Sequence, residues 1–453
     1  MIEKNEMAVF ESELDSFDAA VRKNALNELN ELLNTRKIIP AEASDFHNMH
    51  CHSFYSYNGW GYSPSHLAWL ARKTGMFACG LIDFDVTDGV DEFLGAARKL
   101  DLPAAAGMET RVFVEEFSDK EINSPGEPGV AYHLALGFTR SEVPAECQAF
   151  ANELRQKAAQ RTRTVVEKVN PHVGAAALDF DTDAVSLTPR GNVTERHVCE
   201  AYRVKAEKQF PQKEARAAFW KDILGLDGDT ALAMMDDPVK LEASIRSKLM
   251  KKGGPGYMKA EPSSFPALKA MNDFAIACGA IPTVAWLNGL SAGEADCDAL
   301  LDMHAKYGME MLNIVPDRNW NVPDPEKSAR LIAELNKIVE ACRKRNIPLV
   351  AGTEMNAPGL KIVDDFDHPA LAPILGDFVN GAAILAAHTM LEPSGMGFCS
   401  PWSKAKFADK AARNNWFANF GKLVSPSVFA GAGKNAAEWV EEKFELIANG
   451  EKF

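Results

Sequence analysis

Two stretches of the chain, 45–139 and 266–369, alternate short apolar runs with amphipathic segments. The runs FACGLIDFD (77–85) and AIPTVAWLN (280–288) have the length and composition of buried strands. The segment 326–346, EKSARLIAELNKIVEACRKRN, has apolar residues at helical spacing. Strands that alternate with helices at this spacing predict parallel β/α units, so the sequence indicates an α/β protein.

The rest of the chain falls into three segments with helical patterns. Residues 1–44 form a predicted N-terminal helical arm, which is a candidate contact in a homo-oligomer. Residues 140–265 are long and polar, and they end in the turn-rich sequence KKGGPGYMKAEPSSF, so we interpret them as a helical insertion or cap. Residues 370–453 form a predicted C-terminal helical extension.

Composition limits the partners and the compartment. The formal net charge of −14 disfavours bulk nucleic-acid binding, although a local cation could still hold a small anionic substrate. The eight cysteines contain no C-x-x-C pair, which is typical of thiols in a reducing compartment. We see neither a signal peptide nor an apolar run of membrane-spanning length. We therefore expect a cytoplasmic protein without a membrane partner.

Polar side chains follow several of the predicted strands, where barrel active sites are built. His50 and His52 project to one face of an extended segment, and Glu354 and Asn356 repeat this i, i+2 geometry. Glu109 also ends an apolar run, and a buried carboxylate is costly without a partner. Imidazole and carboxylate ligands suit Zn, Mn or Fe. Each residue alone could equally be structural, for example Glu109 in an ion pair or His133 in the core.

An ordered set of motifs resembles the PHP (polymerase and histidinol phosphatase) family, and in particular its nucleotide-phosphatase branch. The resemblance implies a distorted (β/α)7 TIM-like barrel, at 45–139 and 266–369, that carries metal-dependent phosphoesterase chemistry. No single motif is as specific as the ordered series. The matching segments are HCHS (50–53), IDFDVTDG (82–89), GME (107–109), HLALGF (133–138), ERHV (195–198), ACGAIPTVAW (277–286) and AGTEMN (351–356).

The resemblance implies one retained metal site and weakens two others. One divalent ion would be held by His50, His52, Glu109 and Glu354. A second ion would need His133 together with a histidine at the position of Trp286, so that site lacks a ligand. The third site would need metal ligands where Phe84 and Asn356 stand, so we infer that it is absent. We expect one well-held ion, or two if His133 completes a weak site.

Five further residues are candidates for catalysis or substrate binding. Asp83 could orient a ligand of the metal. His197 could act as a general acid or contact a phosphate, or it could be a surface histidine on a helix. Arg318 could grip an anionic group, or it could belong to a surface Asp–Arg pair. Lys361 and Asn356 could also face the site and bind substrate.

The sequence therefore favours a metal-dependent hydrolase of the PHP type, which acts on a small anionic, phosphorylated metabolite through metal-activated water. Two alternatives remain open at this point. The barrel and metal could serve a different metal-dependent reaction, which the substituted ligands would motivate. The chain could also be a non-catalytic binding or regulatory protein with a PHP-like fold.

Overall fold

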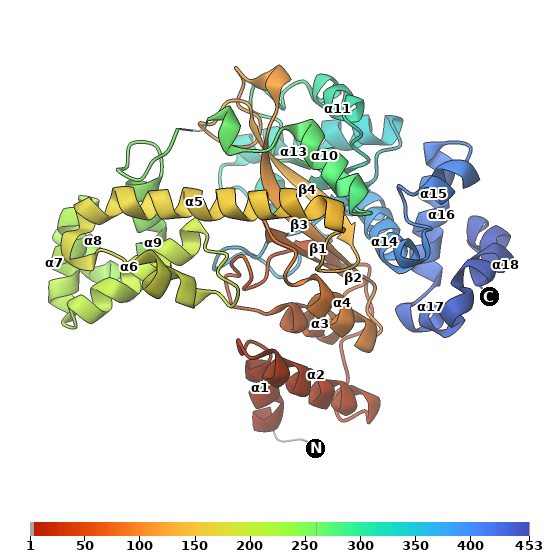
Figure 1. Cartoon of the computed structure of the whole chain (residues 1–453), viewed down its shortest axis with the longest axis horizontal. Helices are drawn as coiled ribbons and strands as arrows, with labels where there is room; N and C mark the ends of the chain where they lie inside the picture. The colour runs from red at the N-terminus through yellow and green to blue at the C-terminus, as the bar shows by residue number, and fades with distance from the viewer. Residues whose placement is uncertain (1–3, 260, 453) are drawn as a thin grey trace.

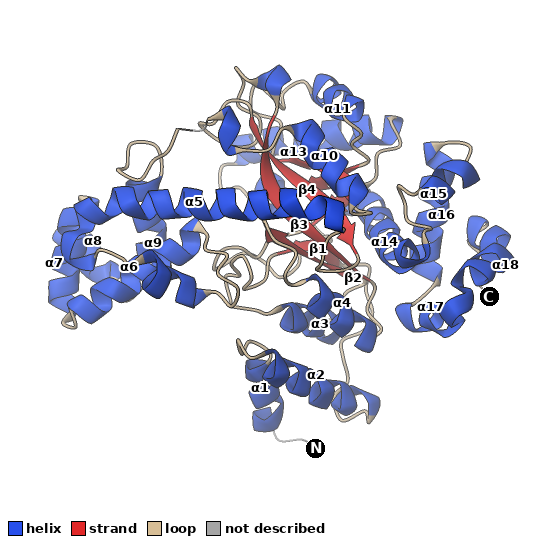
Figure 2. Ribbon diagram, in the orientation of Figure 1, coloured by secondary structure: helices blue, strands red, loops and turns tan. Residues whose placement is uncertain are grey.

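A computed structural model describes residues 4–259 and 261–452. Seven strands form one sheet in which the order in space is the order in sequence. The strands lie together among the helices (Figure 2). The first and last strands approach each other through a bridge between Cys51 and Glu354, so the sheet is a nearly closed barrel. This architecture confirms the predicted α/β, TIM-like fold class. The strands are β1 (His47–Cys51), β2 (Ala78–Phe84), β3 (Ala104–Phe113), β4 (Val130–Phe138), β5 (Ile281–Trp286), β6 (Met311–Ile314) and β7 (Leu349–Ala351).

Strand β4 runs against its neighbours. It pairs antiparallel with both β3 and β5, whereas the four other strand pairs are parallel. The link from β3 to β4 contains only a short 3-10 turn, Glu115–Phe117, so the chain reverses as in a hairpin instead of crossing over through a helix. Our prediction of parallel units is therefore wrong at β4. The residues of β4 nearest the upper rim, where β1, β2 and β3 end, are its first residues.

Helices cover the outside of the barrel. Apolar side chains of these helices and of the strands are buried together in one core. The sequence defines their ends well. Helix α3, for example, begins after Ser63, whose side chain accepts a hydrogen bond from the backbone of His66, and Pro64 occupies its first turn. The helices of this layer are α3 (Pro64–Lys73), α4 (Val90–Lys99), α10 (Leu268–Ala277), α11 (Cys297–Lys306), the short α12 (Asp317–Trp320) and α13 (Pro325–Lys344).

The insertion forms a unit with its own core. Helix α5 (Gln148–Val173) leaves the barrel and extends into a group of helices on the left of Figure 1. Apolar side chains between 165 and 258 pack together in a cluster separate from those of the barrel. We call residues 165–258 the cap. Its remaining helices are α6 (Glu195–Gln209), α7 (Lys213–Leu224), α8 (Gly228–Met234) and α9 (Pro238–Ile245).

The two ends of the chain add helices on other sides of the barrel (Figure 1). The N-terminal helices α1 (Lys4–Glu13) and α2 (Ala19–Asn34) lie near α3 and α4, where Arg22 pairs with Glu92 at 2.5 Å. The C-terminal helices follow from α14 onward, at the opposite side from the cap. They are α14 (Leu375–Leu391), α15 (Pro401–Lys406), α16 (Lys410–Leu423), α17 (Pro426–Ala432) and α18 (Ala436–Ala448).

Helix α14 closes the lower end of the barrel. Its Gly381 lies so close to the start of β7 that an added Cβ would be 1.8 Å from the carbonyl oxygen of Leu349. The helical stretch Ala372–Ser394 is long and apolar enough to span a membrane, contrary to our expectation that no run would be. However, 67% of its most apolar window is buried inside the protein. Its apolar character is thus explained by packing in the core.

Candidate metal centre

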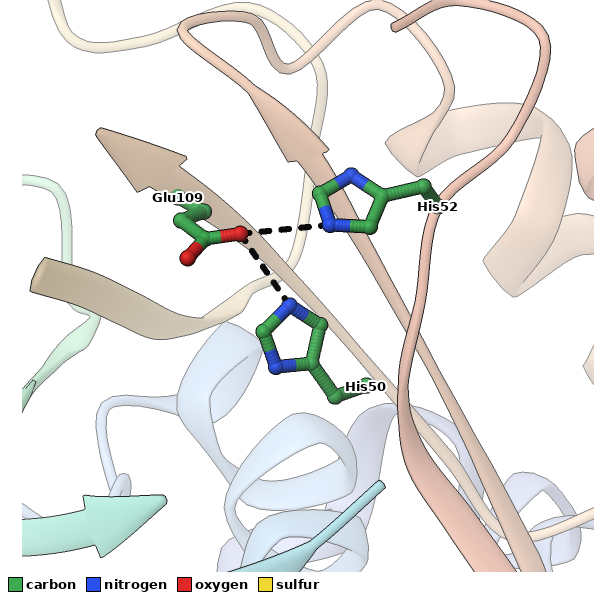
Figure 3. Close-up of side chains that lie close together, drawn as sticks. All are labelled: His50, His52 and Glu109. Carbon is green, nitrogen blue, oxygen red and sulfur yellow. Dashed lines mark hydrogen bonds and ion pairs between the residues drawn. The ribbon is translucent and has the colours of Figure 1, made fainter. Parts of the chain in front are cut away.

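Three side chains converge at the upper end of the barrel (Figure 3). The Nε2 atoms of His50 and His52 each lie 3.2 Å from Oε2 of Glu109. All three side chains are buried, with at most 4% of any of them exposed. Among the residues that the structure describes, this is the one group of three or more potential metal ligands whose ligand atoms lie within 4.8 Å of one another.

Strand geometry explains this convergence. His50 lies in β1 and His52 directly after it, so both imidazoles project from the same face. In the neighbouring pair, Phe84 of β2 is opposite Glu109 of β3, and the ring of Phe84 stacks on His52 with centroids 4.2 Å apart. The predicted positions His50, His52 and Glu109 are therefore brought together by the barrel.

The hydrogen bonds of His50 determine which of its nitrogens carries a proton in the neutral ring. Its Nδ1 lies 2.7 Å from Oδ1 of Asn313 on β6. The amide group of Asn313 is oriented by its Nδ2, which donates to the backbone carbonyls of Val350 and Ile314. An amide oxygen only accepts hydrogen bonds, so Nδ1 of His50 must donate. The lone pair on Nε2 then faces Glu109.

The same reasoning applies to His52. Its Nδ1 lies 3.1 Å from the hydroxyl of Ser56, and that hydroxyl donates its only proton to Oδ1 of Asp83 at 2.7 Å. Nδ1 of His52 therefore donates to Ser56, which leaves the lone pair on Nε2. This Nε2 has no hydrogen-bond partner, although it lies 3.2 Å from Glu109. Asp83 thus contacts His52 through Ser56 rather than directly.

Two imidazole lone pairs and one carboxylate oxygen consequently point at each other in a buried space. Such a group of acceptors could hold a cation, and a divalent ion with nitrogen and oxygen ligands fits it. Without an ion, a proton can partly replace it. Burial opposes protonation of His50, yet Glu109 and Glu354 raise its pKa above the ordinary value. Burial alone would raise the pKa of Glu109, but His50 and His52 lower it to about 2.

Glu354, the fourth predicted ligand, lies beside the cluster with its carboxylate engaged elsewhere. Its backbone exchanges hydrogen bonds with the strand end, donating to His50 and accepting from His52. Its Oε2 accepts from Arg318 at 2.6 Å and from Asn356 at 2.8 Å. Glu354 and Met355 both have left-handed backbones, with φ of 64° and 56°, a strained state that often marks functional sites. Arg318 and Asn356 thus lie at the rim, where both donate to Glu354.

The structure does not bring His133 to the cluster, so its prediction as a ligand is corrected. On β4, Leu134 is opposite Glu109, and His133 is opposite Thr110. Side chains alternate along a strand, so His133 points out of the barrel, where its Nε2 lies 2.5 Å from Asn272 of α10. Burial lowers the pKa of His133 to about 4. Trp286 is likewise part of the outer core, and the inward neighbours of His133 on β4 are Leu134 and Tyr132.

Two other predicted residues have local partners. His197 is buried, so the alternative of a surface histidine is excluded. Its Nδ1 accepts the backbone N–H of Thr194 at the start of α6, and its ring packs edge-on against Tyr57 of the loop after His52. Lys361 pairs with Asp317 at 2.9 Å and lies over the ring of Trp320. These contacts of Lys361 are thus with helix α12.

Sequence reasoning missed the residues that orient the ligands. Ser56 lies in an irregular loop, and no spacing rule connects it to His52 and Asp83. Asn313 could have been found, because it is a polar residue at an inward position of the apolar strand MLNI. The positions of Tyr132 and Arg111 follow from the pairing of β3 with β4, which the sequence alone did not reveal.

Comparisons with known proteins add two distant likenesses. No family model matches the chain, and no curated protein matches it. An amidohydrolase from Chromobacterium violaceum, solved with bound SO4 and no metal, is 15% identical, with a TM-score of 0.47 over 70% of this chain and 91% of that one. A protein from Bifidobacterium adolescentis named as a metal-dependent phosphoesterase is 18% identical, with a TM-score of 0.44 over 75% of this chain and 97% of that one. At these values neither structure assigns a function to the chain.

Fold and site together define an α/β barrel protein with a buried group of two histidines and one glutamate that could hold a metal ion.

Proposed function

We propose that the chain is a metal-dependent hydrolase of the PHP type, which cleaves a phosphate ester in a small anionic metabolite and uses one divalent ion, Zn, Mn or Fe. The observation that carries the proposal is the convergence of two imidazole lone pairs and a carboxylate oxygen at the barrel rim. Three protein ligands leave coordination positions open, as in catalytic rather than structural metal sites. When bound, such an ion lowers the pKa of a coordinated water.

The surrounding residues have separate tasks in this proposal. Glu354 is the fourth ligand or a base beside the ion, and Asn356 holds its carboxylate. Arg318 keeps 41% of its side chain exposed while it pairs with Glu354, so free guanidinium N–H groups remain for an anionic substrate. Asp83 acts through Ser56 to hold the ring of His52. His197 and Lys361 remain candidate substrate contacts.

A single ion is the stoichiometry that the barrel favours. A second site would need His133 and residue 286 inside the barrel, but both side chains belong to its outer layer. The inward positions there are Tyr132 and Ala285, and neither matches the usual nitrogen, thiolate or carboxylate ligands of these ions. The eight cysteines are all free, which supports the proposal of a reducing, cytoplasmic location.

Metal analysis of the purified protein tests the centre. We expect about one ion per chain, in keeping with one three-ligand site. His50→Ala should abolish binding of the ion, whereas His172→Ala, at an exposed histidine of α5, should not change it. A metal-free protein after growth and purification with Zn, Mn and Fe in turn would refute the metal centre and favour a binding protein.

A substrate screen tests the reaction. Phosphomonoesters and phosphodiesters are offered to the protein loaded with each of the three metals, and released phosphate or alcohol is measured. Turnover that is lost in His50→Ala and retained in His172→Ala supports the proposal. A metal-loaded protein that cleaves no phosphate ester but does cleave amides or carboxylic esters would show that the barrel serves a different hydrolysis.

A further inference from the structure

A cavity lies outside the barrel, beside the first turns of helix α5. Its volume is about 140 Å³. It is lined by the loop between β2 and α4, by β3, by the start of α5 with the link before it, and by α10. His50, His52 and Glu109 are not among the described residues that line it. The cavity is therefore separate from the candidate metal centre.

Part of the lining is apolar. Met108 of β3, Val143 of the link before α5 and Phe274 of α10 are all buried and line the cavity. Met108 precedes Glu109 on the same strand, so the two side chains project to opposite faces of the sheet. The cavity and the candidate metal centre thus lie on the two sides of β3, and the cavity can hold the apolar part of a ligand.

Asp85 gives the lining a carboxylate with spare capacity to accept hydrogen bonds. This residue directly follows β2, and its backbone is held by a hydrogen bond to the carbonyl of Glu109 at 2.8 Å. Its Oδ1 accepts from the hydroxyl of Thr110 at 2.6 Å. The contact of its Oδ2 with Arg161 is long for a charged pair, at 3.5 Å. Each carboxylate oxygen has about two lone pairs, so Oδ2 can accept a stronger bond from a ligand.

The other two charges of the lining balance each other. Both carboxylate oxygens of Asp88 accept from one nitrogen of Arg155, at 2.8 and 2.7 Å. Asp85, Asp88 and Arg155 are the charged residues among the described lining, so one negative charge is left over. Arg161 is not part of that lining, and its guanidinium also donates to the carbonyl of Ser264. The lining as a whole therefore favours a cationic ligand.

Gln148, at the start of α5, adds a neutral acceptor to the lining. Its Nε2 donates to Oδ1 of Asn152 at 3.1 Å. The donor and acceptor ends of an amide are separate, so the carbonyl oxygen of Gln148 can still accept from a ligand. An ammonium group carries three N–H donors and no acceptor, which matches a carboxylate and an amide oxygen.

We propose that this cavity binds a small molecule that carries a primary ammonium group on a short apolar chain. The ammonium group bonds to Asp85 and Gln148, and the apolar chain packs against Met108 and Phe274. An apolar cavity of about 150 Å³ accommodates benzene, so a ligand of about five to eight non-hydrogen atoms fits. A free amine and an α-amino acid share this chemistry, and the carboxylate of the latter would bond to the remaining N–H groups of Arg155. The site does not depend on the proposed hydrolase activity.

Isothermal titration of the full-length, chelator-treated protein with butylamine tests the site. We expect one butylamine per chain. Asp85→Asn should weaken binding at least about tenfold, as expected for loss of a charged hydrogen bond. Asparagine can still accept from Thr110, and it tolerates the left-handed backbone of this position, where φ is 59°.

Asp101→Asn is the matched control for Asp85→Asn. Asp101 is exposed, also has a left-handed backbone with φ of 50°, and is not among the described residues that line the cavity. The substitution removes the same charge from the same kind of backbone position. The affinity for butylamine should therefore stay within about twofold of the wild-type value.

Ala151→Leu tests the cavity itself and leaves every charge in place. Ala151 is a lining residue in α5, and leucine is also a good helix former, so the longer side chain should fill the cavity without unfolding the helix. We expect it to abolish butylamine binding. His50→Ala should retain the affinity of the wild-type chain, so the site can be established even if no metal-dependent turnover exists.

Two related probes define the chemistry of the ligand. Butyrate, which lacks the ammonium group, should not bind. Tighter binding of 2-aminobutyrate than of butylamine would identify an amino acid as the ligand, and the reverse order would identify an amine. The inference is overturned if neither compound binds at millimolar concentrations, if butyrate binds as tightly as butylamine, or if Asp85→Asn and Ala151→Leu both retain the wild-type affinity.

Discussion

The barrel buries histidines at both of its ends, and the hydrogen-bond partners of their ring nitrogens differ between the two ends. At the lower end, His388 of α14 has a matched partner for each nitrogen. Its Nε2 donates to the carbonyl of Gly137 at 2.9 Å, and its Nδ1 accepts the backbone N–H of Phe398 at 3.0 Å. At the upper end, His50 and His52 have matched partners only for Nδ1, and their Nε2 atoms both face Glu109.

This difference separates a structural histidine from a candidate ligand. Burial alone does not distinguish the two ends, because all three imidazoles are almost completely inaccessible. The balance of donors and acceptors does distinguish them. Native proteins satisfy nearly all buried polar groups, so three convergent acceptors mark a group that could hold a cation, whereas both ring nitrogens of His388 already have partners.

Glu109→Gln gives the largest expected effect at the upper end. The amide of glutamine can donate to the imidazole lone pairs but is a poor metal ligand. We expect loss of the ion and a fall in activity of at least about a thousandfold, equivalent to about 4 kcal/mol. The unfolding free energy of the metal-free protein should change by no more than about 1 kcal/mol. Severe destabilisation of the metal-free protein with activity retained would contradict the assignment.

His388→Leu should give the opposite result at the lower end. The substitution leaves the carbonyl of Gly137 and the N–H of Phe398 without a partner in the core. We expect the unfolding free energy to fall by about 3 kcal/mol, as measured by urea denaturation. Metal content and activity of the folded fraction should stay unchanged. A metal deficit in this variant would show that the two ends are coupled.

Acid should lower the unfolding free energy of the protein through His388 at the lower end of the barrel. Burial lowers the pKa of this imidazole to about 4, so the folded state binds fewer protons than the unfolded state between pH 4 and 6.5. The stabilisation is complete above pH 6.5 and is lost as the pH falls toward 4, by about 2 to 3 kcal/mol for this one group. The dependence of the unfolding free energy on pH should therefore be shallower in His388→Leu than in the wild type. Equal slopes would disprove this role of His388.

Ser56→Ala should have the smallest effect of the four. It removes the hydroxyl that accepts from Nδ1 of His52, so the ring loses the contact that fixes its tautomer. We expect metal affinity to fall about tenfold to a hundredfold, measured by competition with a chelator. Ser53→Ala is the control, because the hydroxyl of Ser53 also donates to Asp83, whereas Nδ1 of His52 bonds to the hydroxyl of Ser56. Ser56→Thr keeps a hydroxyl and should restore affinity, which a purely steric role of Ser56 would not explain.

Patterns of a few consecutive residues were sufficient to predict the three central residues of the candidate site, His50, His52 and Glu109. The alternation of strands and helices predicted the fold class, and the i, i+2 spacing of His50 and His52 predicted their shared face. Glu109 was expected at the end of an apolar strand, but it lies within β3, at the level where the neighbouring strand β2 ends at Phe84. In each case the information is contained in a few consecutive residues, so no knowledge of strand pairing was needed.

What could not be predicted depends on pairing and on irregular loops. His133 was assigned to the site because β4 was assumed to resemble the other strands, but reversal of the strand and its register place Tyr132 inside instead. The ion pair of Arg318 with Glu354 joins helix α12 to the segment after β7, 36 residues along the chain, and no local pattern connects the two. The contact of Ser56 with His52 depends on a turn whose shape no repeating pattern encodes.

Closure of the lower end of the barrel by α14 has a consequence for how substrate reaches the candidate metal centre. Because α14 packs across the base of the barrel, a ligand would approach His50, His52 and Glu109 from the upper rim. For a hydrolase of the kind proposed, the substrate would enter and the products would leave through this upper rim. Released phosphate should act as a competitive inhibitor, because it would bind at the same groups as the phosphate ester of the next substrate.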